Sequence, residues 1–121
     1  MKKVEWLPDV EYHDYKAAES YLTLIFGEQI AREAAQDLCN LTALGEFKAK
    51  DIFRACGEHL LQTNNSHVRR NLDKIHTKTA LSPILLVTRN GKLVVADGYH
   101  RLCAVYSYDE DAVIPVKHLV I

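Results

Sequence analysis

One segment in the C-terminal part of the chain constrains the fold more than any other, because each of its parts has a distinct signature. Ile84–Thr88 and Leu93–Ala96 are short apolar runs, and Asn90-Gly91 lies between them. Asn-Gly between two apolar runs is typical of a β-hairpin with a two-residue turn. Asp97-Gly98 ends the second run, and a helix is predicted from Tyr99 to about Tyr108. The segment therefore predicts strand, hairpin, strand, sharp turn and helix.

The turn at Gly98 has the features of an anion-binding site. A helix N-terminus leaves backbone N–H groups unpaired and carries a partial positive charge. Glycine lets the backbone turn sharply and approach a ligand closely. His100 and Arg101 lie in the first helical turn and add side-chain donors, of which the guanidinium matches phosphate oxygens. The sequence therefore predicts a phosphate-binding turn between a strand and a helix.

Three residues of this turn allow more than one interpretation. Asp97 precedes the predicted helix and is an N-cap candidate, but it could also hold Mg²⁺ beside a nucleotide or act as a general base. Tyr99 could stack on a base or be a half-buried aromatic residue. Arg101, the expected phosphate ligand, could instead pair with the acidic residues 109–111.

The spacing of apolar residues predicts further helices before this segment. Asp14 is a candidate cap for the first of them, and Gly27 separates the first from the second. After the segment, Val113 to Val120 is predicted as a closing strand, with Pro115 favouring an edge position. The predicted helices cover about Tyr15–Phe26, Glu28–Leu41, Phe47–Cys56 and Ser66–His76.

These elements predict an α+β protein with a small mixed sheet. At 121 residues we expect a single domain over 1–121, with an N-terminal helical part over 1–62 and a core over 63–121 that contains the sheet. A chain of this length can form a hydrophobic core without disulfides or metal ions, and its apolar content of 48% is typical of soluble globular proteins.

Charge and composition narrow the class of protein. The net charge of −1 does not favour nucleic acid as a partner, although residues 1–46 carry −5 and residues 47–121 carry +4. No window is apolar for the roughly 20 residues that span a bilayer, and the N-terminus has no secretory signature. The three cysteines are widely spaced and odd in number, and the histidines lack zinc-ligand spacing. We therefore expect a cytoplasmic protein with free thiols, no structural metal and no membrane association.

Three landmarks in this order resemble the ParB/sulfiredoxin-like superfamily. Ser82-Pro83-Ile84 is similar to the Pro-Ile that opens the first core strand of that family. Gly98-Tyr99-His100-Arg101 is similar to the Gly-x-His-Arg turn of sulfiredoxins and of small ParB-like proteins. Val113-Ile114-Pro115-Val116 is similar to the closing strand. The resemblance covers Ser82 to Leu119 and implies a ParB/sulfiredoxin-like core preceded by an N-terminal helical segment.

The resemblance implies that this turn binds nucleotide phosphates. Members of the superfamily use ATP, bind and hydrolyse CTP, or phosphorylate free serine, so ATP or CTP with Mg²⁺ is the implied ligand. Asp97 and His100 become candidate catalytic residues. The implied phosphate or nucleotide contacts are Gly98, Tyr99, His100 and Arg101, together with Arg70 and Lys74 on the preceding helix, for which a solvated helix face is the alternative.

The chain also departs from the family in ways that limit its chemistry. Tyr99 occupies the position of the catalytic cysteine of sulfiredoxins, and a phenol does not replace a thiolate nucleophile. The turn of ParB has an acid followed by two arginines, whereas this chain has Tyr99, His100 and Arg101, so the metal-assisted CTP hydrolysis of ParB is not expected here. Direct DNA binding is not expected either, because no helix-turn-helix follows and the net charge is −1. If the chain is an enzyme, we expect a nucleotide-dependent phosphotransferase or NTPase. The alternative is a non-catalytic module that binds a protein partner or forms a homo-oligomer on the same fold.

Overall fold

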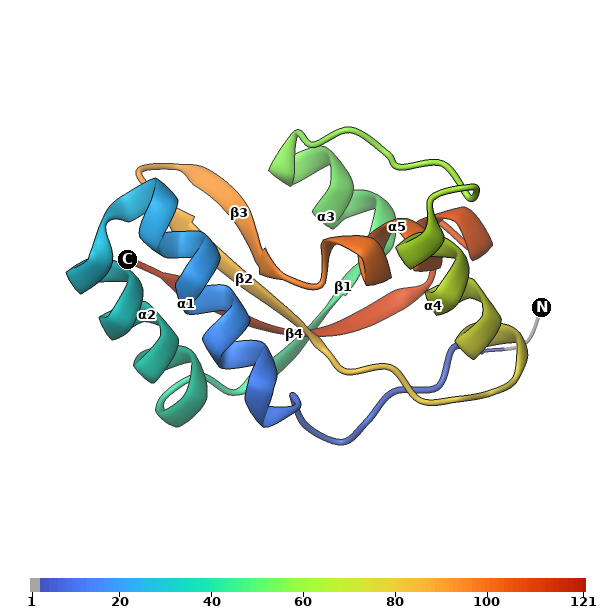
Figure 1. The fold of residues 1–121 in the computed structure, drawn as a ribbon, viewed down its shortest axis with the longest axis horizontal. Coiled ribbons are helices and arrows are strands. Elements are labelled where there is room, and N and C mark those ends of the chain that lie inside the picture. Colours follow the sequence, from blue (N-terminus) through green and yellow to red (C-terminus); the bar gives the residue numbers. More distant parts are fainter. Residues whose placement is uncertain (1–2) are drawn as a thin grey trace.

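Residues 3–121 are described by the structure, which is a computed structural model, and they confirm the predicted α+β class (Figure 1). A four-stranded mixed sheet lies between two groups of helices. The elements in chain order are α1 (Tyr12–Phe26), α2 (Glu28–Asn40), β1 (Leu44–Lys48), α3 (Ala49–Cys56), α4 (Ser66–His76), β2 (Ile84–Arg89), β3 (Lys92–Asp97), α5 (Tyr99–Tyr108) and β4 (Val113–Val120).

The strand order in the sheet is β1-β4-β2-β3. β2 and β3 form the predicted antiparallel hairpin, in which Asn90 and Gly91 have φ angles of 53° and 77°. Positive φ at both central residues is the geometry of a type I′ turn, which Asn-Gly adopts readily. β4 runs parallel to β2 and antiparallel to β1, so it lies inside the sheet. α5 begins directly after β3, the second strand of the hairpin, and the chain then continues into β4 (Figure 1).

Alternate residues of the strands face two separate cores, as the period of a β-strand requires. On one face, α1 and α2 pack on Leu85, Val87 and Val94. On the other face, α3, α4 and α5 pack on a set that includes Ile84 and Leu86. The molecule is thus layered as helices, sheet and helices (Figure 1).

Two of the helix predictions need correction. The predicted third helix begins too early, because Leu44–Lys48 is a strand paired with β4 and only Ala49–Cys56 is helical. The spacing of apolar residues within Ala49–Cys56 does correspond to a helix. The residues before Ala49 are extended because they pair with β4. The N-terminal part of the chain therefore contributes a strand to the sheet. α1 begins at Tyr12 with Glu11 as N-cap residue, so Asp14 is not a cap.

The prediction that the closing strand lies at an edge is also wrong. β4 has β1 on one side and β2 on the other. Pairing with β2 begins at Val116, so Pro115 lies one residue before the first β2–β4 pair. The N–H that proline lacks is therefore not needed for that ladder, and an internal strand accommodates it.

All three cysteines are free, and Cys56 and Cys103 are buried.

Over residues 3–121, no helix combines the length and the apolar character that are needed to traverse a lipid bilayer.

Candidate functional site

α5 begins directly after β3, as the sequence predicts, and Gly98 is its N-cap residue with φ 107° and ψ 19°. The first backbone bond of the helix runs from the N–H of Leu102 to the carbonyl of Gly98, at 2.9 Å. Within residues 3–121, the N–H groups of Tyr99, His100 and Arg101 have no hydrogen-bond acceptor in the protein. Asp97 does not cap them, so that interpretation of its role is wrong. These amides are free to bind something outside the protein.

A pocket of about 420 Å³ opens at this helix start. Its volume lies in the range of small-molecule sites. Its floor is the end of β3 and the turn, and α1 supplies one wall. Glu58, from the loop after α3, adds a second carboxylate besides that of Asp97. The lining residues are Ala17, Tyr21, Glu58, Val95, Ala96, Asp97, Gly98, Tyr99 and His100.

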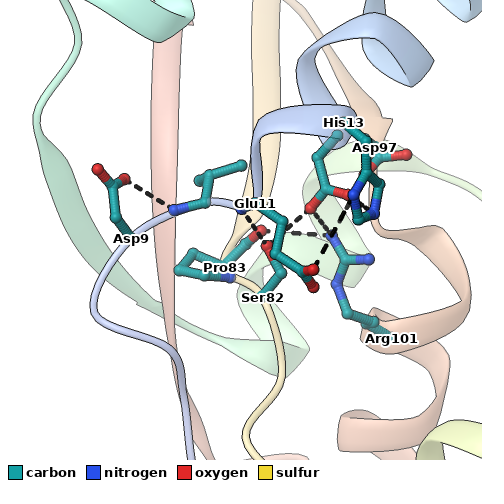
Figure 2. A network of polar contacts seen from close by, with 9 residues as sticks. Asp9, Glu11, His13, Ser82, Pro83, Asp97 and Arg101 are labelled. Carbon is teal, nitrogen blue, oxygen red and sulfur yellow. Dashed lines mark hydrogen bonds and ion pairs between the residues drawn. The ribbon is translucent and has the colours of Figure 1, made fainter.

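Arg101 turns away from this pocket and into the protein. Its Nη2 lies 3.2 Å from Oδ2 of Asp14, 3.3 Å from Oδ2 of Asp97 and 3.3 Å from the carbonyl oxygen of Pro83. Figure 2 shows the guanidinium pointing toward Asp97 and the carbonyl oxygen of Pro83. Its Nε is buried without a partner among the described residues. The guanidinium therefore connects α5 with α1, β3 and the segment before β2, and does not pair with the acidic turn 109–111.

Asp14 is the buried centre of this network. Its side chain is 4% exposed, and Oδ2 accepts a hydrogen bond of 2.7 Å from the hydroxyl of Ser82. Oδ1 lies 3.2 Å from Nε2 of His13. The hydroxyl of Ser82 in turn accepts from the backbone N–H of Glu11 at 3.0 Å (Figure 2). The acid is thus held by a cation, a hydroxyl and an imidazole, which is what a buried carboxylate requires.

The environment of Asp97 differs from that of Asp14. Burial raises the pKa of Asp97 above its ordinary value of 3.8, the guanidinium of Arg101 opposes that rise, and the charge of Asp14 adds to it. Oδ2 faces Arg101, while Oδ1 has no hydrogen bond to the described residues. Asp97 therefore lines the pocket with a carboxyl group whose pKa lies above that of an ordinary aspartate.

His100 lines the pocket, whereas Arg101 does not. Its ring is 4.9 Å from the ring of His67, centroid to centroid. Burial lowers the pKa of His100 below its ordinary value of 6.5, and the charges of His67 and Arg101 lower it further. His100 is therefore a neutral imidazole at pH 7, able to donate one hydrogen bond and accept another.

Tyr99 has its ring 6.5 Å from that of Phe53, and its side chain is half-buried. Burial, followed by the neighbouring Cys103, raises the pKa of Tyr99 to about 12. Tyr99 therefore remains a neutral phenol at physiological pH. This placement favours the half-buried aromatic interpretation.

The remaining predicted contacts lie elsewhere. Arg70 and Lys74 are exposed on α4, and neither lines the pocket. The structure thus gathers Asp97, Gly98, Tyr99 and His100 at one pocket and places Arg101 behind it.

In residues 3–121, no cluster of three or more His, Cys, Asp or Glu side chains is arranged to hold a metal ion.

Sequence reasoning missed the role of Asp14 and Ser82. A signal was present, because Asp14, Ala18 and Leu22 follow one another at i, i+4 and i+8 and all are buried. An acid on the apolar stripe of a helix predicts a buried partner of opposite charge. Nothing in the sequence says that this partner is Arg101, 87 residues away.

Comparisons of this chain with protein-family models, with curated proteins and with solved structures give no match. The interpretation of the site therefore depends on its geometry and on the resemblance of its motifs.

Proposed function

We propose that this protein binds a phosphate-bearing small ligand, a nucleotide among them, at the start of α5. The observation that carries the proposal is the set of backbone N–H groups at Tyr99, His100 and Arg101, which have no acceptor in the described part of the protein. They lie beside a pocket of about 420 Å³. Unpaired amides and the helix dipole together favour phosphate oxygens. The resemblance of Ser82–Leu119 to the ParB/sulfiredoxin-like superfamily supports the same ligand class.

Two neighbouring side chains have different roles in this proposal. His100 hydrogen-bonds the ligand, since it lines the pocket and its neutral imidazole has a donor to offer. Arg101 is a positioning residue, because its guanidinium already has three acceptors inside the protein. It fixes the turn on which the amides are presented, and the ligand does not need to displace it.

The carboxylates of Asp97 and Glu58 line the same pocket and would repel a bare phosphate. Mg²⁺ resolves this conflict, because it takes one or two carboxylates together with phosphate oxygens and water. Asp97 fits that requirement with Oδ1, which has no other partner among the described residues. Asp97 and Glu58 would hold the ion, which supplies charge neutralisation at the phosphates. ATP or CTP with Mg²⁺ is therefore the first ligand to test.

Phosphoryl transfer or hydrolysis is the reaction that these groups support. As the alternative to holding Mg²⁺, Asp97, whose pKa is raised by burial, would accept the proton of the attacking hydroxyl or water. The amides of α5 and His100 would hydrogen-bond the oxygens of the transferred group. Tyr99 stays protonated and supplies no nucleophile.

The test is thermal unfolding and calorimetric titration with ATP, CTP and inorganic phosphate, each with and without Mg²⁺. A ligand at a hundred times its Kd stabilises the folded state by about 2.7 kcal/mol, which a melting experiment resolves easily. We expect Mg²⁺ to strengthen nucleotide binding and His100→Ala to weaken it. Glu58→Gln should strengthen binding of inorganic phosphate in the absence of Mg²⁺, since one repulsive charge is gone.

Arg70→Ala and Lys74→Ala are the matched controls. Both side chains are exposed on α4 outside the pocket, so binding should be unchanged. If the two variants abolish binding while His100→Ala does not, the ligand is on α4 and the proposed site is wrong. No stabilisation by any of the three ligands at millimolar concentration would refute the proposal.

A non-catalytic interaction module is a second candidate function. It is favoured by a different observation, the exposed outer edge of the sheet at β1, where Phe47 is 45% exposed.

A further inference from the structure

The two edges of the sheet are covered very differently. β3, at one edge, is packed by α1 and α3, and its residues Val94 to Ala96 are buried. β1, at the other edge, is exposed at all five residues of Leu44–Lys48. An exposed edge strand presents unpaired N–H and C=O groups that another strand can pair with. The edge at β1 is therefore the open one.

The phase of the ladder shows which residues of β1 point outward. The N–H of Ala49 donates to the carbonyl of Ala112 at 2.9 Å, and these residues continue the β1–β4 register. In an antiparallel pair, every second residue directs both backbone groups to its partner strand. Phe47 therefore bonds toward β4, while Glu46 and Lys48 direct their N–H and C=O groups outward.

The exposed edge strand β1 carries one negative and one positive side chain close together. Glu46-Phe47-Lys48 carries opposite charges on either side of an exposed aromatic residue, and neither charge forms a salt bridge within residues 3–121. We propose that two copies of this chain pair antiparallel through β1, with Phe47 opposite Phe47 of the partner subunit. This register places Glu46 opposite Lys48 of the partner subunit, and the two-fold axis repeats that pair.

The hydrogen bonds and the side chains favour the same register. Glu46 and Lys48 are the residues whose backbone groups point outward, so each pair exchanges two backbone hydrogen bonds across the interface. A shift that brings Glu46 opposite Glu46 of the partner subunit keeps the bonds but juxtaposes like charges, which is destabilising. The charge pattern therefore selects the register centred on Phe47.

The side chain of Phe47 gives the interface an apolar centre. Its ring lies edge-on to His118, with centroids 6.1 Å apart, beside a groove of about 270 Å³. That groove is lined mainly by apolar side chains from α3 and the sheet, among them Ile52 and Leu86. Phe47 of the partner subunit would lie on the same face and cover part of this exposed surface, since a two-fold axis perpendicular to the sheet keeps its faces in common.

Sedimentation velocity over a range of concentrations tests the proposal. We expect a reversible monomer–dimer equilibrium. Glu46→Lys and Lys48→Glu should each weaken dimerisation by about tenfold, because each places like charges opposite one another at two symmetry-related positions. The double variant Glu46→Lys/Lys48→Glu exchanges the charges and should restore the dimer. Failure of the double variant to restore it would overturn the register.

Glu46→Pro gives a second test that spares the monomer. The N–H of Glu46 points outward, so its loss removes an intermolecular bond and no β1–β4 bond. Dimerisation should be abolished while the melting temperature of the dilute monomer is nearly unchanged.

Two outcomes overturn the proposal. A dimer that survives Glu46→Pro would use another surface. A chain that stays monomeric at millimolar concentration would mean that Glu46 and Lys48 only protect the edge from pairing. Nucleotide binding, measured on the same variants, should be unaffected, because the pocket lies at the end of β3, on the far edge of the sheet. Failure of either proposal therefore leaves the other standing.

Discussion

The two sides of the turn that opens α5 differ in how their polar groups are satisfied. On the protein side, the guanidinium of Arg101 hydrogen-bonds to Asp14, Asp97 and the carbonyl oxygen of Pro83. On the pocket side, His100 lines the pocket, and the amides of the first helical turn have no acceptor among residues 3–121. Consecutive residues thus serve different purposes. Arg101 stabilises the fold, and the adjacent residue His100 is available to bind a ligand.

This contrast has a physical origin in the cost of burying charge. Asp14 is almost fully buried, and an isolated carboxylate in that position would be strongly unfavourable. Arg101 compensates it, which requires the guanidinium to stay behind the turn. A motif that resembles a phosphate-binding Gly-x-His-Arg turn therefore has its arginine engaged in a structural ion pair in this chain.

The largest effect is expected from breaking the network behind the turn. Arg101→Met leaves the carboxylate of Asp14 buried without its cation, and the free energy of unfolding should fall by about 3–5 kcal/mol. Urea denaturation measures it. Arg69→Ala, an exposed arginine on α4, is the control and should change stability by no more than about 0.5 kcal/mol. A loss below about 1 kcal/mol in Arg101→Met would show that the guanidinium is dispensable behind the turn.

An intermediate effect is expected at the turn itself. Gly98 has φ 107°, and a Cβ there would lie 2.9 Å from Nη2 of Arg101 and 3.0 Å from Cγ1 of Ile84. Gly98→Ala should therefore lower stability by about 1–3 kcal/mol through backbone strain, and the contact displaces the guanidinium as well. Gly57→Ala is the matched control, since Gly57 has φ 68° but open space around its Cβ position. Equal losses in both variants would mean that the contact with Arg101 contributes nothing.

The smallest effect is expected in front of the turn. Because the folded state holds the pKa of His100 below 6.5, the unfolded chain binds the proton more readily. Stability is therefore lost as the pH falls below about 6.5, and His100→Gln should reduce this loss while leaving stability at pH 7.5 nearly unchanged. Urea titrations at pH 7.5 and pH 5.5 measure both. An identical pH dependence in the wild type and in His100→Gln would show that the imidazole does not titrate differently on folding.

Much of the local structure followed from the sequence. The hairpin at Asn90-Gly91 and the helix Tyr99–Tyr108 were predicted with their observed positions, because each depends on neighbouring residues. The helix Ser66–His76 is equally local, since the side chain of Asn65 caps it by accepting from the N–H groups of His67 and Val68. The candidate pocket was located for the same reason, as the end of a strand and the start of a helix define it.

The errors share one cause, which is contact between residues far apart in the chain. β1 is a strand because β4 pairs with it, although its sequence adjoins a helical pattern. β4 is internal because β1 and β2 flank it, although it contains Pro115. The position of a side chain such as that of Arg101 is also nonlocal, since its partner Asp14 lies on α1.

The sequence alone therefore determined the α+β class, the hairpin and the sharp turn that opens α5, since hydrogen bonds and backbone preferences between near neighbours specify them. Only the tertiary structure decided which polar groups at that turn form hydrogen bonds within the protein and which remain available to a ligand. That outcome depends on burial and charge pairing across the whole chain, where the partner of Arg101 is 87 residues distant.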